Sequence, residues 1–204
     1  EHQATHDPLT ALPNRAALAA HLERVLASAS AGKPVALLML DLCRFKEVND
    51  TLGHNVGDRV LCEVAQRFKW TIGAHGFIAR IGGDEFTAVL ELDDNVNAVA
   101  EISQKLHDCL RTPIDVSGLA IDVGVSIGIA LYPLDALDAN TLLKHADVAM
   151  YVAKRRGSLY ECYDAAHDQH SIRRLTMVSE LRGAVGTSAI SLHYPPKVSL
   201  QSEE

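Results

Sequence analysis

The chain has 204 residues, 48% of them hydrophobic, and a formal net charge of −7 at pH 7. This composition predicts one full domain with an apolar core, with room for a short appendage, and excludes a disordered chain. The acidic balance argues against a nucleic-acid-binding surface, but it is compatible with one nucleotide bound through a metal ion. No apolar run approaches the roughly 18 residues needed to span a bilayer, and no signal peptide is visible.

The four cysteines are widely spaced and form no Cys-x-x-Cys pair; they are Cys43, Cys62, Cys109 and Cys162. This usage is typical of reduced thiols in a cytosolic protein and does not predict a zinc site. We therefore expect a cytoplasmic domain. The start at Glu1-His2-Gln3 is typical of a cut inside a longer chain, so a membrane anchor elsewhere in the full-length protein stays open.

The first strand of the fold is predicted at 35–40, after a turn-rich opening and an amphipathic helix capped by Asn14. Its unbroken apolar run is typical of a central strand that is covered on both faces. Asp41 follows at the carboxyl end of this strand, where sheet proteins often place ligand groups. A carboxylate that caps the next helix is an equally good interpretation. The next segments predict a helix at 45–52, ended by Gly53, and a second helix that opens at Gly57-Asp58.

A tight hairpin is predicted where Gly82-Gly83 separates two apolar runs, 77–81 and 86–90. Its turn carries two adjacent acids, Asp84 and Glu85. Glycines let phosphates approach the backbone closely, and acids at the same place would repel those phosphates unless a cation lay between them. The stretch therefore indicates a metal-bridged nucleotide site, although solvated acids on an exposed hairpin would show the same pattern.

The second half of the chain alternates helices and strands. The pattern predicts a helix at 95–110, a hairpin of 114–116 with 119–125, a strand at 126–132, a helix at 139–155 and a closing strand at 159–163. Beyond residue 165 the pattern weakens to a helix at 172–185 and a short strand at 190–192. The order predicts an α/β or α+β fold, in which helices pack on a central, mostly antiparallel sheet.

Several separated motifs, taken together and in order, resemble the GGDEF family of diguanylate cyclases. The resemblance covers about residues 5–165, and its motifs lie at 7–15, 41–50, 53–58, 80–86, 126–130 and 146–154. It implies a ferredoxin-like core related to nucleotide cyclases, with the GGDEF motif on a β-hairpin. It also implies a reaction that joins two GTP molecules into cyclic di-GMP and releases two pyrophosphates. Each domain would hold one GTP, so activity would need a homodimer of domains and Mg²⁺ (or Mn²⁺).

The resemblance also implies roles for individual residues. The metal ligands would be Asp41, Asp84 and the backbone carbonyl of Leu42. The catalytic turn would consist of Gly82, Gly83, Asp84 and Glu85, with Glu85 either a second metal ligand or the base on the 3′-hydroxyl. Substrate would be bound by Asn49 and Asp58 at the guanine and by Lys46 and Lys154 at the phosphates, with Phe45 beside them. Arg80 would stabilise the hairpin or reach across a dimer, and it receives no catalytic role.

Three departures from the family pattern have consequences. Residues 73–76 stand where the family has an Arg-x-x-Asp inhibitory site and carry neither charge, so we expect no product inhibition there. Cys43 replaces a common Asp that is not usually a metal ligand. Ser158 replaces a frequent Arg that contacts phosphate, which costs roughly 1.5–3 kcal/mol of binding unless Arg155 or Arg156 compensates.

The tail at 193–198 is similar to the start of an EAL-type phosphodiesterase domain, except that Pro195 departs from the usual pattern. We therefore expect a GGDEF domain at 1–165, followed at 166–204 by a linker helix and a truncated EAL start. The leading hypothesis is an active diguanylate cyclase with GTP as substrate and cyclic di-GMP as product. The first alternative is a GTP-binding module that regulates an EAL domain of the same full-length chain. The second is a dimerisation module that binds no nucleotide.

Overall fold

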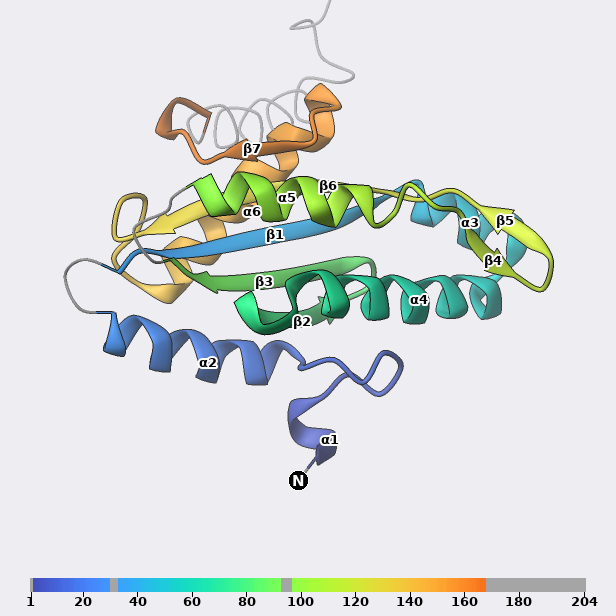
Figure 1. Ribbon diagram of the computed structural model, residues 1–204, viewed down its shortest axis with the longest axis horizontal. Coiled ribbons are helices and arrows are strands. Elements are labelled where there is room, and N and C mark those ends of the chain that lie inside the picture. Colours follow the sequence, from blue (N-terminus) through green and yellow to red (C-terminus); the bar gives the residue numbers. More distant parts are fainter. Residues whose placement is uncertain (1, 30–32, 93–96, 168–204) are drawn as a thin grey trace, which may run out of the picture. The chain divides into compact units, whose positions relative to one another are not determined.

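A computed structural model describes residues 2–29, 33–92 and 97–167 of the chain. Their centre is a five-stranded sheet in the order β2-β3-β1-β6-β7 (Figure 1). Its strands are β1 (Val35–Cys43), β2 (Gly76–Gly82), β3 (Glu85–Glu91), β6 (Gly124–Tyr132) and β7 (Tyr160–Cys162). All neighbours run antiparallel except β6 and β7, which are parallel. The expected α/β fold with a mostly antiparallel sheet is confirmed.

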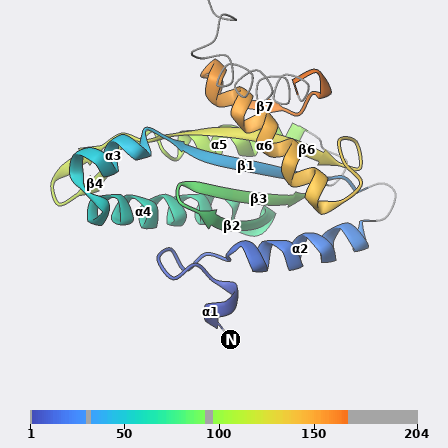
Figure 2. The ribbon, with the colours of Figure 1, turned by 180° about the vertical axis from the view of Figure 1, so that it is seen from behind.

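Helices cover both faces of this sheet (Figures 1 and 2). The helices are α1 (His2–Thr5), α2 (Arg15–Ser28), α3 (Phe45–Leu52), α4 (His54–Ile72), α5 (Asn97–Asp108) and α6 (Ala139–Arg156), with a 3₁₀ turn at Gly73–His75. In β1, Leu38 and Leu40 belong to the core cluster shared with α4 and α5. Leu37 and Met39 belong to the cluster shared with α2 and α6. This alternation is why the run at 35–40 is apolar throughout.

The helix α6 packs unusually close to β6, because Gly128 has no side chain. A Cβ added there would collide with backbone atoms of Ala146 and Met150, so no rotamer change could relieve the clash. This close contact fixes the position of α6 over the sheet. The helix predicted at 139–155 is confirmed to within one residue. No helix in the described part of the chain is long and apolar enough to cross a membrane.

The prediction that a helix opens at Gly57-Asp58 was wrong. The helix α4 begins at His54, directly after α3, and the amides of Val56 and Gly57 both donate to the carbonyl of Gly53. Gly53 can join the two helices because its φ of 84° lies in the left-handed region, which a glycine adopts without strain. Gly57 lies inside the helix instead of at its start.

The predicted strand at 119–125 is also shorter than expected. Ile114–Val116 (β4) and Leu119–Ile121 (β5) form a separate hairpin, and the next strand begins at Gly124, where pairing with β1 starts opposite Cys43. The positive φ angles of Ser117 and Gly118 give this hairpin its tight turn. The helix expected at 95–110 is observed from Asn97 to Asp108. The segments predicted at 172–185 and 190–192 lie outside the described residues.

Candidate functional site

The carboxyl end of β1 meets the β2–β3 turn, and this brings the predicted metal and catalytic residues together. Asp41 lies opposite Glu85 in the β1–β3 pairing, so both side chains stand on the face of the sheet that α6 covers. The amide of Leu42 donates to the carbonyl of Asp84 at 3.3 Å, which ties the turn to the end of β1. Asp41 is only 7% exposed, whereas Asp84 and Glu85 are half-buried.

The β2–β3 turn has the open geometry that its glycines were expected to provide. Gly82 has a φ of 151° and Gly83 a φ of 55°, both unfavourable for other residues. A Cβ placed on either glycine would have nothing within 4 Å, so the space above the turn is free of protein. A ligand can therefore approach the backbone of the turn directly.

Arg80 holds the turn from inside the protein. This side chain is 9% exposed, and its Nε and Nη2 donate to the carbonyl of Gly83 at 3.1 and 2.7 Å. Its Nη1 donates to Asp7 Oδ1 at 2.8 Å, and the same oxygen accepts the amide and the hydroxyl of Thr10. Of the two roles considered for Arg80, the structure supports stabilisation of the hairpin, because these bonds commit the guanidinium within the chain.

Lys154 reaches the site from the last turns of α6. Its Nζ lies 2.6 Å from Asp41 Oδ2, and this hydrogen bond raises the pKa of Lys154. The side chain of Lys154 is 48% exposed, so the ammonium can leave Asp41 without unfolding the helix. Lys46, the other predicted phosphate ligand, is exposed on α3.

The end of β1 is crowded with negative charge. Burial raises the pKa of Asp41, against the hydrogen bond from Lys154, and the charge of Asp84 adds to the rise. Burial also raises the pKa of Glu85, and the charges of Asp147 and Asp41 add to it. Desolvation and the charge of Asp41 raise the pKa of Asp147 itself. These carboxylates favour a cation at this point.

Asp147 was missed as a site residue, although it lies in the motif at 146–154. One sequence signal could have found it. Asp147 precedes Lys154 by seven residues, which places both on one side of α6.

The donor set suits Mg²⁺ bound together with a nucleotide. Among the described residues, no group of three or more His, Cys, Asp or Glu side chains could hold a metal ion alone. Mg²⁺ usually takes one or two protein carboxylates and completes its shell with phosphate oxygens and water. Asp41 and Asp84 offer that number of carboxylates beside an open turn.

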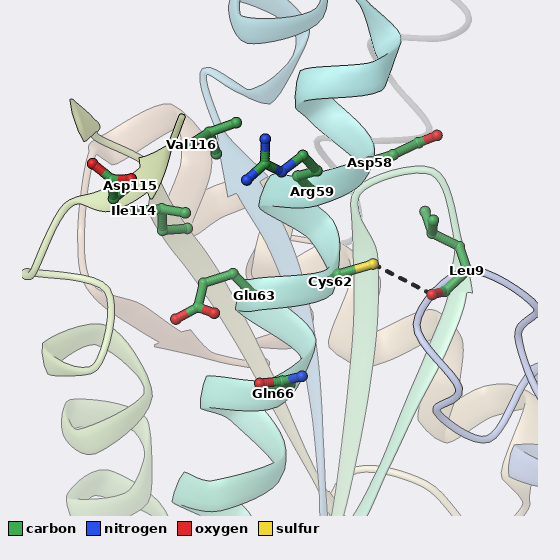
Figure 3. A pocket seen from close by; sticks show the side chains of 9 residues that line it. All are labelled: Leu9, Asp58, Arg59, Cys62, Glu63, Gln66, Ile114, Asp115 and Val116. Atoms are coloured by element: carbon green, nitrogen blue, oxygen red, sulfur yellow. Dashed lines mark hydrogen bonds between the residues drawn. The ribbon is translucent and has the colours of Figure 1, made fainter. Parts of the chain in front are cut away.

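The residues expected to recognise guanine lie where α3 meets α4. The carboxamide of Asn49 and the buried ring of Phe45 both lie against Gly57, the residue before Asp58. Asp58 is exposed and lines a pocket of about 310 Å³ between α4, the N-terminal loop and β4 (Figure 3). Leu9 lines the same pocket and accepts a hydrogen bond from the Cys62 thiol at 3.3 Å. Leu9 was not singled out from the sequence.

The departures from the family pattern have clear local structures. Cys43 Sγ lies 3.2 Å from the Ser126 hydroxyl. The Ser158 hydroxyl donates to Glu161 at 2.8 Å, and Arg156 pairs with the same carboxylate at 3.0 Å. Arg156 is therefore engaged elsewhere than at a phosphate. The guanidinium of Arg155 lies 5.9 Å from the centre of the Tyr151 ring.

The segment at 73–76 contributes to a second pocket, of about 490 Å³. His21, which stacks on Phe77 at a centroid distance of 4.0 Å, lines it with His75 and Glu91. Among the residues that the structure describes, no arginine lines this pocket. The lining supports the expected absence of product inhibition at this segment, which stays a prediction.

Comparison with known proteins identifies the family. A family model described as "Diguanylate cyclase, GGDEF domain" matches residues 4–159. The chain belongs to this family. It is 39% identical over 197 residues to the bifunctional diguanylate cyclase/cyclic di-GMP phosphodiesterase MucR of Pseudomonas aeruginosa. That match covers 96% of this chain but only 29% of MucR.

Two solved structures show how far the GGDEF fold is shared. The GGDEF domain of TpbB (YfiN) from Pseudomonas aeruginosa is 38% identical and superposes with a TM-score of 0.76, covering 80% of this chain and 97% of that one. The coiled coil and GGDEF domain of DgcB from Caulobacter crescentus, in complex with c-di-GMP, is 30% identical with a TM-score of 0.70. That match covers 80% of this chain and 87% of the chain in that structure.

We predict that Arg80→Lys lowers the free energy of unfolding by about 1–3 kcal/mol, because a lysine cannot bond Gly83 and Asp7 together and a buried acceptor loses its donor. Urea denaturation of the purified domain measures this. Arg59→Lys is the matched control: Arg59 is exposed and makes one bond, to the Ser117 hydroxyl, so its change should stay within about 0.5 kcal/mol. Equal losses in the two variants would contradict the role given to Arg80.

We predict that Asp147→Asn raises the thermal unfolding temperature at pH 7. A carboxyl whose pKa is raised in the folded state costs stability as pH rises from its unfolded pKa through its folded pKa. The gain should therefore shrink as pH falls through the raised folded pKa and vanish below the ordinary value of 3.8, where both states are protonated. Scanning calorimetry at several pH values tests this, with Asp122→Asn as control, because both acids are exposed but Asp122 lies outside the carboxylate cluster at the end of β1. A gain that stays constant with pH would contradict the electrostatic cause.

Proposed function

We propose that this GGDEF domain is a diguanylate cyclase that condenses two GTP molecules into cyclic di-GMP and releases two pyrophosphates. The observation that carries the proposal is the junction of β1 with the β2–β3 turn. There Asp41 lies opposite Glu85, and the backbone of Leu42 is bonded to that of Asp84. This junction puts two carboxylates beside an open glycine turn, which suits a triphosphate bridged by a cation.

In this proposal Asp41, Asp84 and the carbonyl of Leu42 hold Mg²⁺ (or Mn²⁺). When bound, the ion supplies charge neutralisation at the phosphates and activation of the attacking 3′-hydroxyl. Gly82 and Gly83 let the phosphates lie against the backbone of the turn. Lys154 leaves Asp41 and, with Lys46, holds the outer phosphates.

Glu85 is proposed to act either as the acceptor of the 3′-hydroxyl proton or as a second metal ligand. Its side chain stands opposite Asp41 at the junction of β1 with the turn. Burial and the charges of Asp147 and Asp41 raise the pKa of Glu85 in the absence of a cation, whereas a divalent ion held by Asp41 and Asp84 would lower it. Both roles therefore belong to the proposal.

Guanine recognition is assigned to Asn49 and Asp58. A carboxylate accepts hydrogen bonds from the N1 and N2 hydrogens of guanine, and adenine lacks that pair of donors. The carboxamide of Asn49 supplies both a donor and an acceptor, so it can serve O6 as well. The two residues come from adjacent helices that meet at Gly57.

Assembly follows from the reaction. Because each domain holds one GTP, the two substrates react only when two domains face each other, so a homodimer is part of the proposal. We further propose a cytoplasmic location and an EAL domain in the same full-length protein. The residues similar to an EAL start, 193–198, lie outside the described part of the chain.

One observation favours a second candidate, a GTP-binding module that regulates an EAL domain. At the end of α6, Arg156 is paired with Glu161 and Arg155 lies over the Tyr151 ring, so as they stand neither replaces the phosphate contact that an arginine at position 158 would make. GTP binding would then rest on fewer positive charges. The similarity to MucR, a protein named as both cyclase and phosphodiesterase, is compatible with either candidate.

The deciding experiment incubates the protein at high concentration with GTP and Mg²⁺ and detects cyclic di-GMP by chromatography. We predict turnover that Asp84→Ala reduces by roughly 100-fold or more, since a bound ion contributes several kcal/mol to the transition state. If the wild type is too dilute to dimerise, a fused parallel coiled coil holds two domains together. GTP binding without turnover in the fused dimer would favour the regulatory module, and no GTP binding would contradict both candidates.

A second prediction concerns Lys154, because its ammonium lies on Oδ2 of Asp41, the carboxylate that a divalent cation would also use in the proposed site. Lys154→Gln should bind Mn²⁺ more tightly in the absence of nucleotide. The same variant should bind GTP about 10- to 150-fold more weakly, because it loses one charge-assisted contact. Electron paramagnetic resonance measures the Mn²⁺ affinity and calorimetry the GTP affinity.

The matched control for this prediction is Lys46→Gln. Lys46 is exposed on α3, so its loss should weaken GTP binding and leave Mn²⁺ affinity unchanged. Unchanged Mn²⁺ affinity in Lys154→Gln would show that the Lys154–Asp41 pair does not compete with the metal ion.

A further inference from the structure

Two glycines lie near the start of α4, and the structure requires them for different reasons. Gly53 has a φ of 84°, and nothing lies within 4 Å of a Cβ built on it, so its backbone conformation explains it. Gly57 lies inside α4 and has no positive φ. Alanine would favour the helix more than glycine does at such a position, so the backbone of Gly57 does not explain the residue.

The space beside Gly57 does explain it. A Cβ built on Gly57 would fall well inside contact distance of Asn49 Oδ1, and it would stand 3.0 Å from Asn49 Cγ and 3.2 Å from Phe45 Cζ. Asn49 and Phe45 lie one turn apart on α3, so together they present one face to α4. Phe45 is 6% exposed and packed in the core, so the ring has little room to yield. The group that an added methyl would displace is the carboxamide of Asn49.

We propose that Gly57 is a positioning residue for guanine recognition: its missing side chain leaves the space in which the Asn49 carboxamide lies against α4. The inference rests on the proposed function, because it concerns the same nucleotide site. Gly57 directly precedes Asp58, so one stretch of backbone sets the position of both groups assigned to the base. Displacing the carboxamide would weaken the contact that separates guanine from adenine, since hydrogen bonds need their short distances and alignment.

The test is a double-mutant cycle of Gly57→Ala and Asn49→Ala, with GTP and ATP affinities measured by calorimetry and unfolding temperatures measured without nucleotide. Gly57→Ala should weaken GTP binding about 5- to 150-fold, the cost of losing a buried hydrogen-bond partner, and leave ATP affinity nearly unchanged. In the Asn49→Ala background the same substitution should change GTP affinity less than 2-fold. There it should also lower the unfolding temperature less than it does in the wild type, because the clash with the carboxamide is gone and only the 3.2 Å contact with Phe45 Cζ remains.

Asn55→Ala is the control, because Asn55 is an exposed residue of the same helix turn and should leave the GTP-to-ATP preference unchanged. Wild-type GTP affinity and preference in Gly57→Ala would overturn the inference. Where Gly57→Ala fails to fold, rescue by Asn49→Ala supports the inference, and failure of rescue overturns it. If the wild type binds no GTP, the proposed function fails, and the Gly57–Asn49 contact is then tested by the unfolding temperatures alone. Non-additive changes would then support the Gly57–Asn49 contact, and additive changes would overturn it.

Discussion

Repulsion among carboxylates at the end of β1 is the constraint on which the site depends. Asp41, Glu85 and Asp147 all have raised pKa values, each with burial as the largest cause and the charge of another carboxylate as a further one. Asp41 is buried and Glu85 half-buried, and a protein selected for stability alone would not place like charges together there. Without a ligand, Lys154 neutralises one of them, at the exposed end of a long side chain. Under the proposed function, a bound cation would neutralise the negative charge that Lys154 leaves uncompensated.

The turn that carries Asp84 and Glu85 has to stay in place against this repulsion, and its support comes from backbone atoms. Arg80 binds the carbonyl of Gly83, and the amide of Leu42 binds the carbonyl of Asp84. Neither bond uses a carboxylate oxygen of the turn. Both acids therefore keep their oxygens for a ligand, while Asp7, distant in sequence, compensates the charge of Arg80. The turn is therefore held in place through its backbone carbonyls, and its two carboxylates take no part in holding it.

Hydrophobic pattern was enough to predict the elements that build this site. The run at 35–40, the apolar runs around Gly82-Gly83 and the helical repeat at 139–155 are each long and regular, and all were placed correctly. Gly57 misled the prediction because glycine usually marks a helix end, and only the neighbouring Asn49 shows why it lies inside one. Asp147 was missed because a single acid on an amphipathic helix is normally solvated. The bond from Arg80 to Asp7 joins residues that no local pattern connects.

The end of α6 bears on whether this chain catalyses or only binds. Arg156 pairs with Glu161, so in the proposed complex the positive charges left for a triphosphate are those of Lys154, Lys46 and Arg155. Losing one phosphate contact that is equally strong in the ground state and the transition state raises KM and leaves kcat unchanged. The groups proposed to act on the reacting atoms, Asp41, Asp84 and Glu85, are all present at the junction of β1 with the turn. Under the proposed function, the departure at Ser158 therefore raises the GTP concentration that the domain needs, and it leaves the proposed chemistry of the site intact.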